Sequence, residues 1–286
     1  ELVCCGDDFD YFSHAVTLGE DFDFDYSNQL PEKSRYFRNN KSAPFGFVGT
    51  GILSSPFIIL GNFLDYTIGN VSKNNVDFKI LLYSFSSIFY FLASLKFLKT
   101  ISIHYRVNNN YFLYFLGSGI IYYIFERYSM TPIYEVFSIF LIIVLTLKFI
   151  NDQTKIKQYS LLIPLSILLA ILVRWTNLFA LLVPAIIILT SDQYKYLFKK
   201  IINKYFIISA LASLGLFALH SKLIYGIITF SPSYVYMVDE FDNLVQVNLF
   251  NNFSGIISDS FSDLLVILFS QEFGLIWFAP ILFFGT

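Results

Sequence analysis

Long apolar runs alternate with short polar segments along most of this chain. Such runs cover residues 80–97, 111–125, 133–150, 159–190 and 206–224, and a further one begins at 275–284. At about 1.5 Å of rise per residue, roughly 20 apolar residues in a helix cross the hydrocarbon core of a bilayer. The pattern therefore predicts a bundle of membrane-spanning helices. Thr131 and Pro132 open the third run, since proline suits the first turn of a helix.

Two apolar stretches do not fit a single straight span. Residues 159–190 are too long for one, and a polar group interrupts them at 174–177, so we predict two short helices hinged at Arg174. Residues 43–64 are broken by proline and glycine at Pro44, Gly46, Gly49, Gly51 and Pro56. That density favours a re-entrant or interfacial helix that does not cross the membrane.

The composition supports a membrane protein. Of the 286 residues, 56% are hydrophobic and only 14% are charged, whereas soluble domains carry about 25% charged residues. The net charge of -2 argues against a nucleic-acid partner. Cys4 and Cys5 are adjacent, so they form neither an ordinary disulfide framework nor a metal site of their own. The chain begins at Glu1 and ends inside an apolar run, and we expect a fragment in which an earlier transmembrane helix ends at ELVCC.

Lysine and arginine are concentrated in three polar segments that the predicted spans would place on the same side of the membrane. Cytoplasmic loops of membrane proteins carry an excess of these residues. We therefore expect a cytoplasmic position for Lys99 and Arg106, for Lys155 and Lys157, and for Lys195, Lys199, Lys200 and Lys204. The acidic segment 7–25, the 126–132 turn, Arg174 and the loop 225–263 then face outward. This loop has no lysine or arginine and carries Asp239, Glu240, Asp242, Asp259 and Asp263. The candidate polar sites are thus predicted on the extracytoplasmic face of a plasma (inner) membrane.

Residues 6–30 form the acid-rich stretch, which is the leading candidate for chemistry. It holds seven carboxylates: Asp7, Asp8, Asp10, Glu20, Asp21, Asp23 and Asp25. A charge costs about 2.5–3.5 kcal/mol to place in hydrocarbon, so this stretch should lie in water or in a polar cavity at the membrane edge. We predict a short amphipathic helix with Asp7 or Asp8 at its N-terminus and Gly19 as its C-cap. The alternative is that the acids only cap a surface helix.

The acid-rich stretch, GDDFDYFSHAVTLGEDFDFDYSNQL, resembles the first-loop motif of polytopic GT-C glycosyltransferases, in which a tyrosine follows an acidic pair. These enzymes include the protein O-mannosyltransferases and the lipid A aminoarabinose transferases. Four further segments resemble the same superfamily in the same order: RYSMTPIYEVFSIFLIIV, ILVRWTNLFALLVPAIIIL, KLIYGIITFSPSYV and LFSQEFGLIWFAPILFF. The chain departs from the family where Asp7-Asp8 replaces Asp-Glu and where Thr131-Pro132 replaces Ser-His.

The resemblance implies an all-α integral membrane fold of the GT-C type, a multi-span helical bundle with extracytoplasmic loops and interfacial helices. Residues 1–286 would then be one domain. In it, 6–76 form the first outer loop with its interfacial helices, 77–224 the transmembrane helices, 225–274 a large outer loop, and 275–286 the start of a further transmembrane helix.

The resemblance also implies transfer of a sugar from a polyprenyl-phosphate-linked donor to a protein, lipid or cell-envelope glycan. Such a reaction needs a base for the acceptor and a cation for the departing phosphate. Asp7 matches the first acid of the family's pair and is the expected base, with Asp8 next. Arg174 is the expected phosphate ligand, since arginine binds phosphate in a bidentate fork. The alternative for Arg174 is a snorkelling residue at a helix end.

Other residues complete the expected site. Lys41 and Lys222 fall on the outer side and could bind phosphate, although ordinary interfacial lysines would look the same. Glu135 lies just inside a span, where an ionisable residue suggests a functional site, and Tyr11 is the tyrosine that follows the acidic pair. Asp7 and Asp8 could hold Mg²⁺ or Mn²⁺ through their oxygens. The histidines His14 and His220 lack a partner set with metal-ligand spacing.

Two other functions remain open on the sequence. The broken stretches 43–64 and 159–190 would suit a transporter or a flippase for lipid-linked sugars, which would also need internal repeats and ionisable groups near mid-membrane. A non-catalytic membrane subunit would need no acidic pair. In every case membrane lipids are partners of the chain.

Overall fold

The computed structural model describes residues 7–30, 37–38, 41–69, 77–107, 111–191 and 193–228. The predictions for the outer loop beyond residue 228 and for the span that begins at 275 lie outside these residues. Within them the chain is almost entirely helical, with one antiparallel pair of two-residue strands, β1 (Phe37–Arg38) and β2 (Lys41–Ser42), in which Phe37 pairs with Ser42. The all-α class is therefore confirmed for the described part of the chain.

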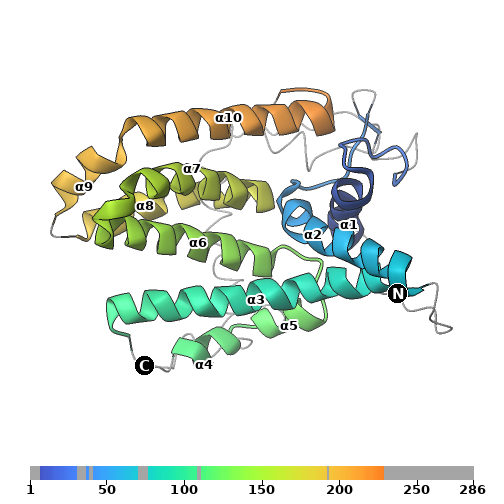
Figure 1. The fold of residues 1–286 in the computed structure, drawn as a ribbon, viewed down its shortest axis with the longest axis horizontal. Coiled ribbons are helices and arrows are strands. Elements are labelled where there is room, and N and C mark those ends of the chain that lie inside the picture. The colour runs from blue at the N-terminus through green and yellow to red at the C-terminus, as the bar shows by residue number, and fades with distance from the viewer. Residues whose placement is uncertain are drawn as a thin grey trace, which may run out of the picture.

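Long apolar helices lie side by side and form the body of the molecule (Figure 1). Four of them pack in sequence order, each against the next: α3 (Phe78–Tyr105), α6 (Pro132–Asn151), α7 (Ile156–Val173) and α10 (Lys204–Tyr225). Together with residues 49–68, which include α2 (Gly49–Leu64), they make five helices that are long and apolar enough to cross a membrane. This finding supports a membrane-embedded protein.

Shorter elements connect the long helices. They are α1 (Asp7–Val16), the π-helical turns Thr17–Asp21 and Asp65–Gly69, α4 (Tyr111–Leu116), α5 (Ile120–Phe125), the 3₁₀ turns Gln153–Lys155 and Trp175–Leu181, α8 (Leu182–Leu189) and α9 (Tyr194–Ile201). The predicted hinge at Arg174 is confirmed, because this residue is extended (φ −157°, ψ 135°) between α7 and a 3₁₀ turn. Pro132 opens α6 as predicted.

Residues 111–125 do not form the single span that their hydropathy suggested. The chain makes two short helices, α4 and α5, separated by Gly117-Ser118-Gly119, and Gly119 has a left-handed backbone (φ 78°) that ends one helix before the next begins. The preceding span is longer than predicted. It continues as helix through Tyr105, so Lys99 lies in α3 and not in a polar loop.

The predicted C-cap at Gly19 is also wrong. After Val16 the helix widens into the π turn Thr17–Asp21, which ends at Phe22 in the left-handed conformation (φ 57°). Gly19 lies inside that turn, where a Cβ would come within 2.8 Å of the side chain of Ile58. Glycine is needed there for the close approach of α2, not for ending the helix.

Helices α1 and α2 lie at one end of the bundle, beyond the ends of α6 and α7 (Figure 1). Gly49 begins α2 against the end of α7, where a Cβ would lie 2.3 Å from the backbone of Leu172. Phe57 of α2 packs edge-on against Tyr90 of α3, with ring centroids 6.2 Å apart. The position of α2 leaves open whether it crosses a membrane, so its re-entrant character stays a prediction.

The bundle has two chemically different ends. At the acidic end, defined by the contacts of Asp8 with Arg127 and of Glu135 with Arg174, α1 and α2 lie beyond the ends of α6 and α7. The loop before α2 contacts the end of α10 there. At the lysine end, defined by residues 105–107, 151–156, 190–191 and 193–204, Asn151 contacts His104 and Asn203 contacts Ser160. The predicted lysine segments thus share one end, and the candidate polar residues share the other. The side of the membrane that each end faces stays a prediction.

Candidate functional site

A pocket of about 460 Å³ opens at the acidic end of the bundle, where α1, the start of α6 and the hinge after α7 converge. Its volume lies in the usual range for small-molecule sites, about 300–1,000 Å³. Charged, hydroxyl and aromatic groups line it: Asp7, Tyr11, Tyr123, Met130, Thr131, Pro132, Arg174, Trp175 and Thr176. The expected base, the expected phosphate ligand and the motif tyrosine therefore border one pocket, although they come from distant parts of the chain.

Asp7 is the first residue of α1 and is exposed. Its carboxylate makes no hydrogen bond or ion pair with any residue in the described part of the chain. The positive end of the α1 dipole stabilises a negative charge at this position. The helix thus fixes the backbone of Asp7, and its carboxylate oxygens are available to a bound molecule.

Asp8 has a different environment. Its side chain is 4% exposed, and Arg127 Nη2 lies 3.1 Å from one of its oxygens. The hydroxyl of Ser129 donates a 2.8 Å hydrogen bond to the other. The negative charge of Asp8 raises the pKa of the Arg127 guanidinium above its ordinary value. Asp8 therefore fastens the start of α1 to the turn that precedes α6, and this turn forms one wall of the pocket.

Arg174 reaches the pocket from the hinge after α7, and its side chain is 52% exposed. Its Nη1 lies 3.3 Å from Oε1 of Glu135, which belongs to the first turn of α6. This single contact leaves most of the guanidinium donors for another anion. Glu135 does not line the pocket itself, but it contacts Arg174, which does, and so helps to position the arginine.

Lys41 and Lys222 are not among the residues that line this pocket. The Lys41 ammonium donates a 2.6 Å hydrogen bond to the carbonyl oxygen of Leu223, at the last turn of α10. Both lysines are exposed. The structure therefore separates these two candidates from Asp7 and Arg174.

A buried polar network holds the far side of α1. Because a carbonyl can only accept, the Nε2–H of His14 donates to Gly46 O (3.2 Å), and the Tyr26 hydroxyl donates to Nδ1 of His14 (2.7 Å). The Tyr225 hydroxyl donates to the same Gly46 oxygen at 2.6 Å. Burial lowers the pKa of His14 to about 3, so the imidazole is neutral. This network joins α1, the loop before α2 and the end of α10, and it has a structural role.

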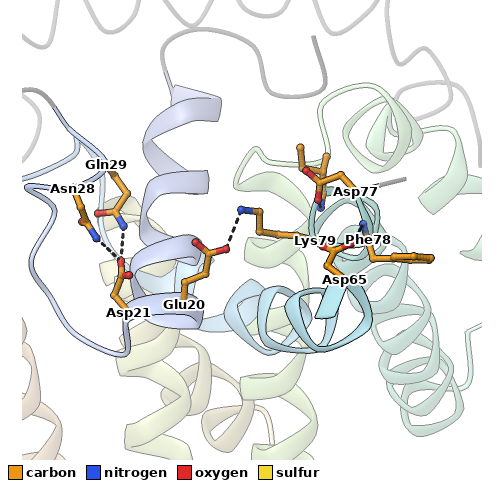
Figure 2. A network of polar contacts seen from close by, with 9 residues as sticks. Glu20, Asp21, Asn28, Gln29, Asp65, Asp77, Phe78 and Lys79 are labelled. Atoms are coloured by element: carbon orange, nitrogen blue, oxygen red, sulfur yellow. Dashed lines mark hydrogen bonds and ion pairs between the residues drawn. The ribbon is translucent and has the colours of Figure 1, made fainter. Parts of the chain in front are cut away.

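The second acidic cluster of the stretch is also structural (Figure 2). Glu20 forms a 2.9 Å ion pair with Lys79, and Asp65 accepts hydrogen bonds from the backbone N–H groups that begin α3. Asp21 accepts from the side-chain amides of Asn28 and Gln29. Hydrogen bonds from Ser27 lower the pKa of the exposed Asp25. These contacts give the acids structural roles. Of them, only Asp65, which lies outside the acid-rich stretch, caps a helix, so the capping interpretation is not confirmed for Glu20, Asp21 and Asp25.

Several residues of the site were not predicted from the sequence: Arg127 and Ser129, which hold Asp8, and Tyr123, Met130 and Trp175, which line the pocket. Arg127 carried a usable signal, since a cation in a turn that is predicted to face outward departs from the charge rule for loops and can pair with acids predicted on the same side. The aromatic residues carried none, because 20% of this chain is aromatic.

The pair Asp7 and Asp8 does not fit a divalent cation by itself. Arg127 and Ser129 occupy the oxygens of Asp8, and Mg²⁺ or Mn²⁺ prefers several oxygen ligands around it. Within the described ranges, no group of three or more His, Cys, Asp or Glu side chains could hold a metal ion.

The chain was compared with known proteins at the level of family, sequence and fold. No protein-family model, curated protein or solved structure matches it.

Proposed function

We propose that the protein transfers a sugar from a polyprenyl-phosphate-linked donor to an acceptor hydroxyl or amine in the pocket at the acidic end. In this reaction the acceptor loses a proton to the Asp7 carboxylate and bonds to the anomeric carbon of the sugar. The bond from that carbon to the phosphate oxygen breaks, and the phosphate leaves on its lipid with the electron pair. Arg174 stabilises the charge of this leaving group.

The observation that carries the proposal is the shared pocket of Asp7 and Arg174. A base must be ionised and accessible, and Asp7 is exposed and without a partner among the described residues. A phosphate ligand must keep free donors, and Arg174 uses one contact to Glu135. Asp8, with both oxygens occupied, is the weaker candidate for the base and the better one for positioning.

The surroundings of the pocket suit a lipid-linked sugar. The aromatic side chains of Tyr123 and Trp175 offer apolar surfaces beside polar groups, as in sites that take amphipathic ligands. Trp175 also borders an apolar groove of about 300 Å³ between α7 and α10, which includes Ile171 and Phe217. A hydrocarbon chain in that groove would bring its phosphate close to Arg174.

A transporter or a flippase would instead be expected to carry ionisable groups near the middle of its spans. The charged residues of α6, α7 and α10 all lie within the first or last four residues of their helices: Glu135, Lys148, Lys157, Lys204 and Lys222. In these three helices the distribution favours a site at the membrane edge over a transport path through the bundle. In α3, Lys79 lies in the first turn, and Lys96 and Lys99 lie within the last ten residues, toward the lysine end.

The proposal is tested by Asp7→Asn in the full-length protein, assayed with a polyprenyl-phosphate sugar donor. Asparagine keeps the shape and can still cap α1, but it cannot act as a base, so we expect turnover to fall by about 10²–10⁴-fold at equal expression. Asp23→Asn is the matched control, since Asp23 is exposed and only accepts a hydrogen bond from a backbone N–H. Equal activity of Asp7→Asn and Asp23→Asn would exclude Asp7 as the base.

A further inference from the structure

The lysine end carries a group of cations that the proposed reaction does not use. We call it the lysine patch and define it as Lys157 of α7, Lys195 and Lys199 of α9, and Lys204 of α10. All four side chains are exposed, and no carboxylate in the described part of the chain lies within ion-pair distance of them. Several like charges without a counterion favour the binding of an external anion.

Helix α9 is held so that its lysines face outward. Leu197 and Ile201 are 1% and 4% exposed and pack against apolar side chains of α6 and α7. Lys195 and Lys199 are four residues apart, so they lie on one face of the helix, away from the buried pair. Figure 1 shows α9 at the end of the bundle, between α8 and α10. The patch therefore sits at the ends of helices that can span a membrane.

One tyrosine ring brings two of the patch lysines, from different helices, together. The ammonium groups of Lys157 and Lys204 lie 5.7 Å and 5.3 Å from the centroid of the same ring, that of Tyr205. Lys195 lies 5.8 Å from the ring of Tyr194, which is 39% exposed. Tyrosine beside lysine is typical of the headgroup level of a bilayer, where both side chains place their polar ends in water.

An exposed apolar surface begins directly beside the cations. Ile207 and Ile208 follow Lys204 by three and four residues, so they share its face of α10, and they are 48% and 59% exposed. Ile202, between α9 and α10, is 61% exposed. A free anion would use only the lysines, whereas a lipid would place its headgroup on the lysines and its acyl chains on these isoleucines.

We propose that the lysine patch binds the phosphate headgroup of anionic membrane lipids, with their acyl chains against Ile202, Ile207 and Ile208. Clusters of lysine next to a transmembrane helix attract anionic lipids electrostatically, and here an apolar surface continues from the cluster. This inference does not depend on the proposed transferase activity.

The test is lipid binding by the full-length protein in detergent, with phosphatidylglycerol and phosphatidylcholine supplied in equal amounts and the bound lipids counted by native mass spectrometry. We expect the parent to retain phosphatidylglycerol preferentially. Replacing the four patch lysines by glutamine should weaken this binding by about tenfold or more. Replacing the same four by arginine keeps the charge and should preserve it. Inorganic phosphate at millimolar concentration should not displace the lipid.

Two results would overturn the proposal. One is an unchanged lipid preference in the glutamine variant, and the other is displacement by inorganic phosphate, which would indicate a simple anion site. If the glutamine variant does not fold, the lipid preference of the parent protein is measured at high salt instead. Screening of about 1 M NaCl should abolish the preference for phosphatidylglycerol, and a preference that survives it contradicts an electrostatic site.

Discussion

The guanidinium of Arg127 and the carboxylate of Asp8 form an ion pair, with Nη2 3.1 Å from Oδ2. This contact joins the acid-rich stretch to the turn before α6, and Ser129 of the same turn occupies the second carboxylate oxygen. As a result the two adjacent acids have different environments. Asp8 is tied into the wall of the pocket, while Asp7 faces the space that the wall encloses.

Arg127→Ala should destabilise the protein more than Asp8→Asn. The alanine variant leaves a nearly buried carboxylate without its cation, and we expect a loss of about 1–3 kcal/mol, limited by the partial exposure of Arg127. Asparagine in place of Asp8 keeps an acceptor for Ser129 and removes the charge. Melting temperatures of both variants in one detergent check the order, and an unchanged melting temperature for Arg127→Ala would show that the pair is unimportant.

Arg174→Lys should weaken binding of a polyprenyl-phosphate sugar by about tenfold, because lysine keeps the charge but loses the bidentate fork. Equilibrium binding of the donor measures this directly. Arg106→Lys is the matched control, since Arg106 is exposed at the lysine end and far from the pocket in the bundle. If both variants bind like the parent, Arg174 is not a phosphate ligand.

Stability should fall as the pH drops from neutral, partly through His14. Burial lowers the pKa of His14 in the folded state from its ordinary value of 6.5 to about 3, so between these values the unfolded state binds a proton that the folded state does not. His14 therefore leaves the free energy of unfolding unchanged above pH 6.5 and lowers it by about 1.4 kcal/mol per pH unit between pH 6.5 and about 3. Melting curves between neutral pH and about pH 5 avoid most carboxylate titration. His14→Gln should flatten the dependence, and an equally steep curve for this variant would contradict the assignment.

Gly49→Ala should lower stability by about 1–3 kcal/mol, because a Cβ at Gly49 would lie 2.3 Å from the backbone of Leu172 and push α2 away from α7. Gly215→Ala, in α10, is the control. No described atom lies within 4 Å of its added Cβ, so helix propensity should make it neutral or stabilising by up to about 1 kcal/mol. Thermal unfolding of the two variants compares them, and equal melting temperatures would refute the close approach.

Membrane orientation can be read from single cysteines in a background without Cys4 and Cys5. Ser27 is exposed at the acidic end and Gln193 is exposed at the lysine end. An impermeant maleimide should label Ser27→Cys in intact cells and Gln193→Cys only after permeabilisation, as the charge distribution predicts. The reverse pattern would place the pocket on the cytoplasmic side of the membrane and would contradict the proposed extracytoplasmic binding of the donor.

The sequence by itself determined the membrane class, the helices α6 and α10 and the hinge at Arg174. Each of these depends on local features, namely the length of an apolar run, a proline at a first turn, or a polar interruption that a long helix could not bury. The division of charges between the two ends could also be predicted from the sequence, since an antiparallel bundle returns alternate loops to the same end. The break between α4 and α5 was a local signal too, at Gly117 and Gly119, that hydropathy concealed.

Only the tertiary structure decided which acids are free and which are bound. Asp7 and Asp8 are alike in sequence, and their difference comes from Arg127 and Ser129, whose position depends on the packing of α5 and α6. The role of Gly19 likewise depends on Ile58 of α2. Contacts between distant segments cannot be predicted from the periodicity of apolar residues, because they depend on how whole helices pack. For that reason Asp7, Tyr11 and Arg174 could be named as site residues beforehand, but the pocket that joins them could not be predicted.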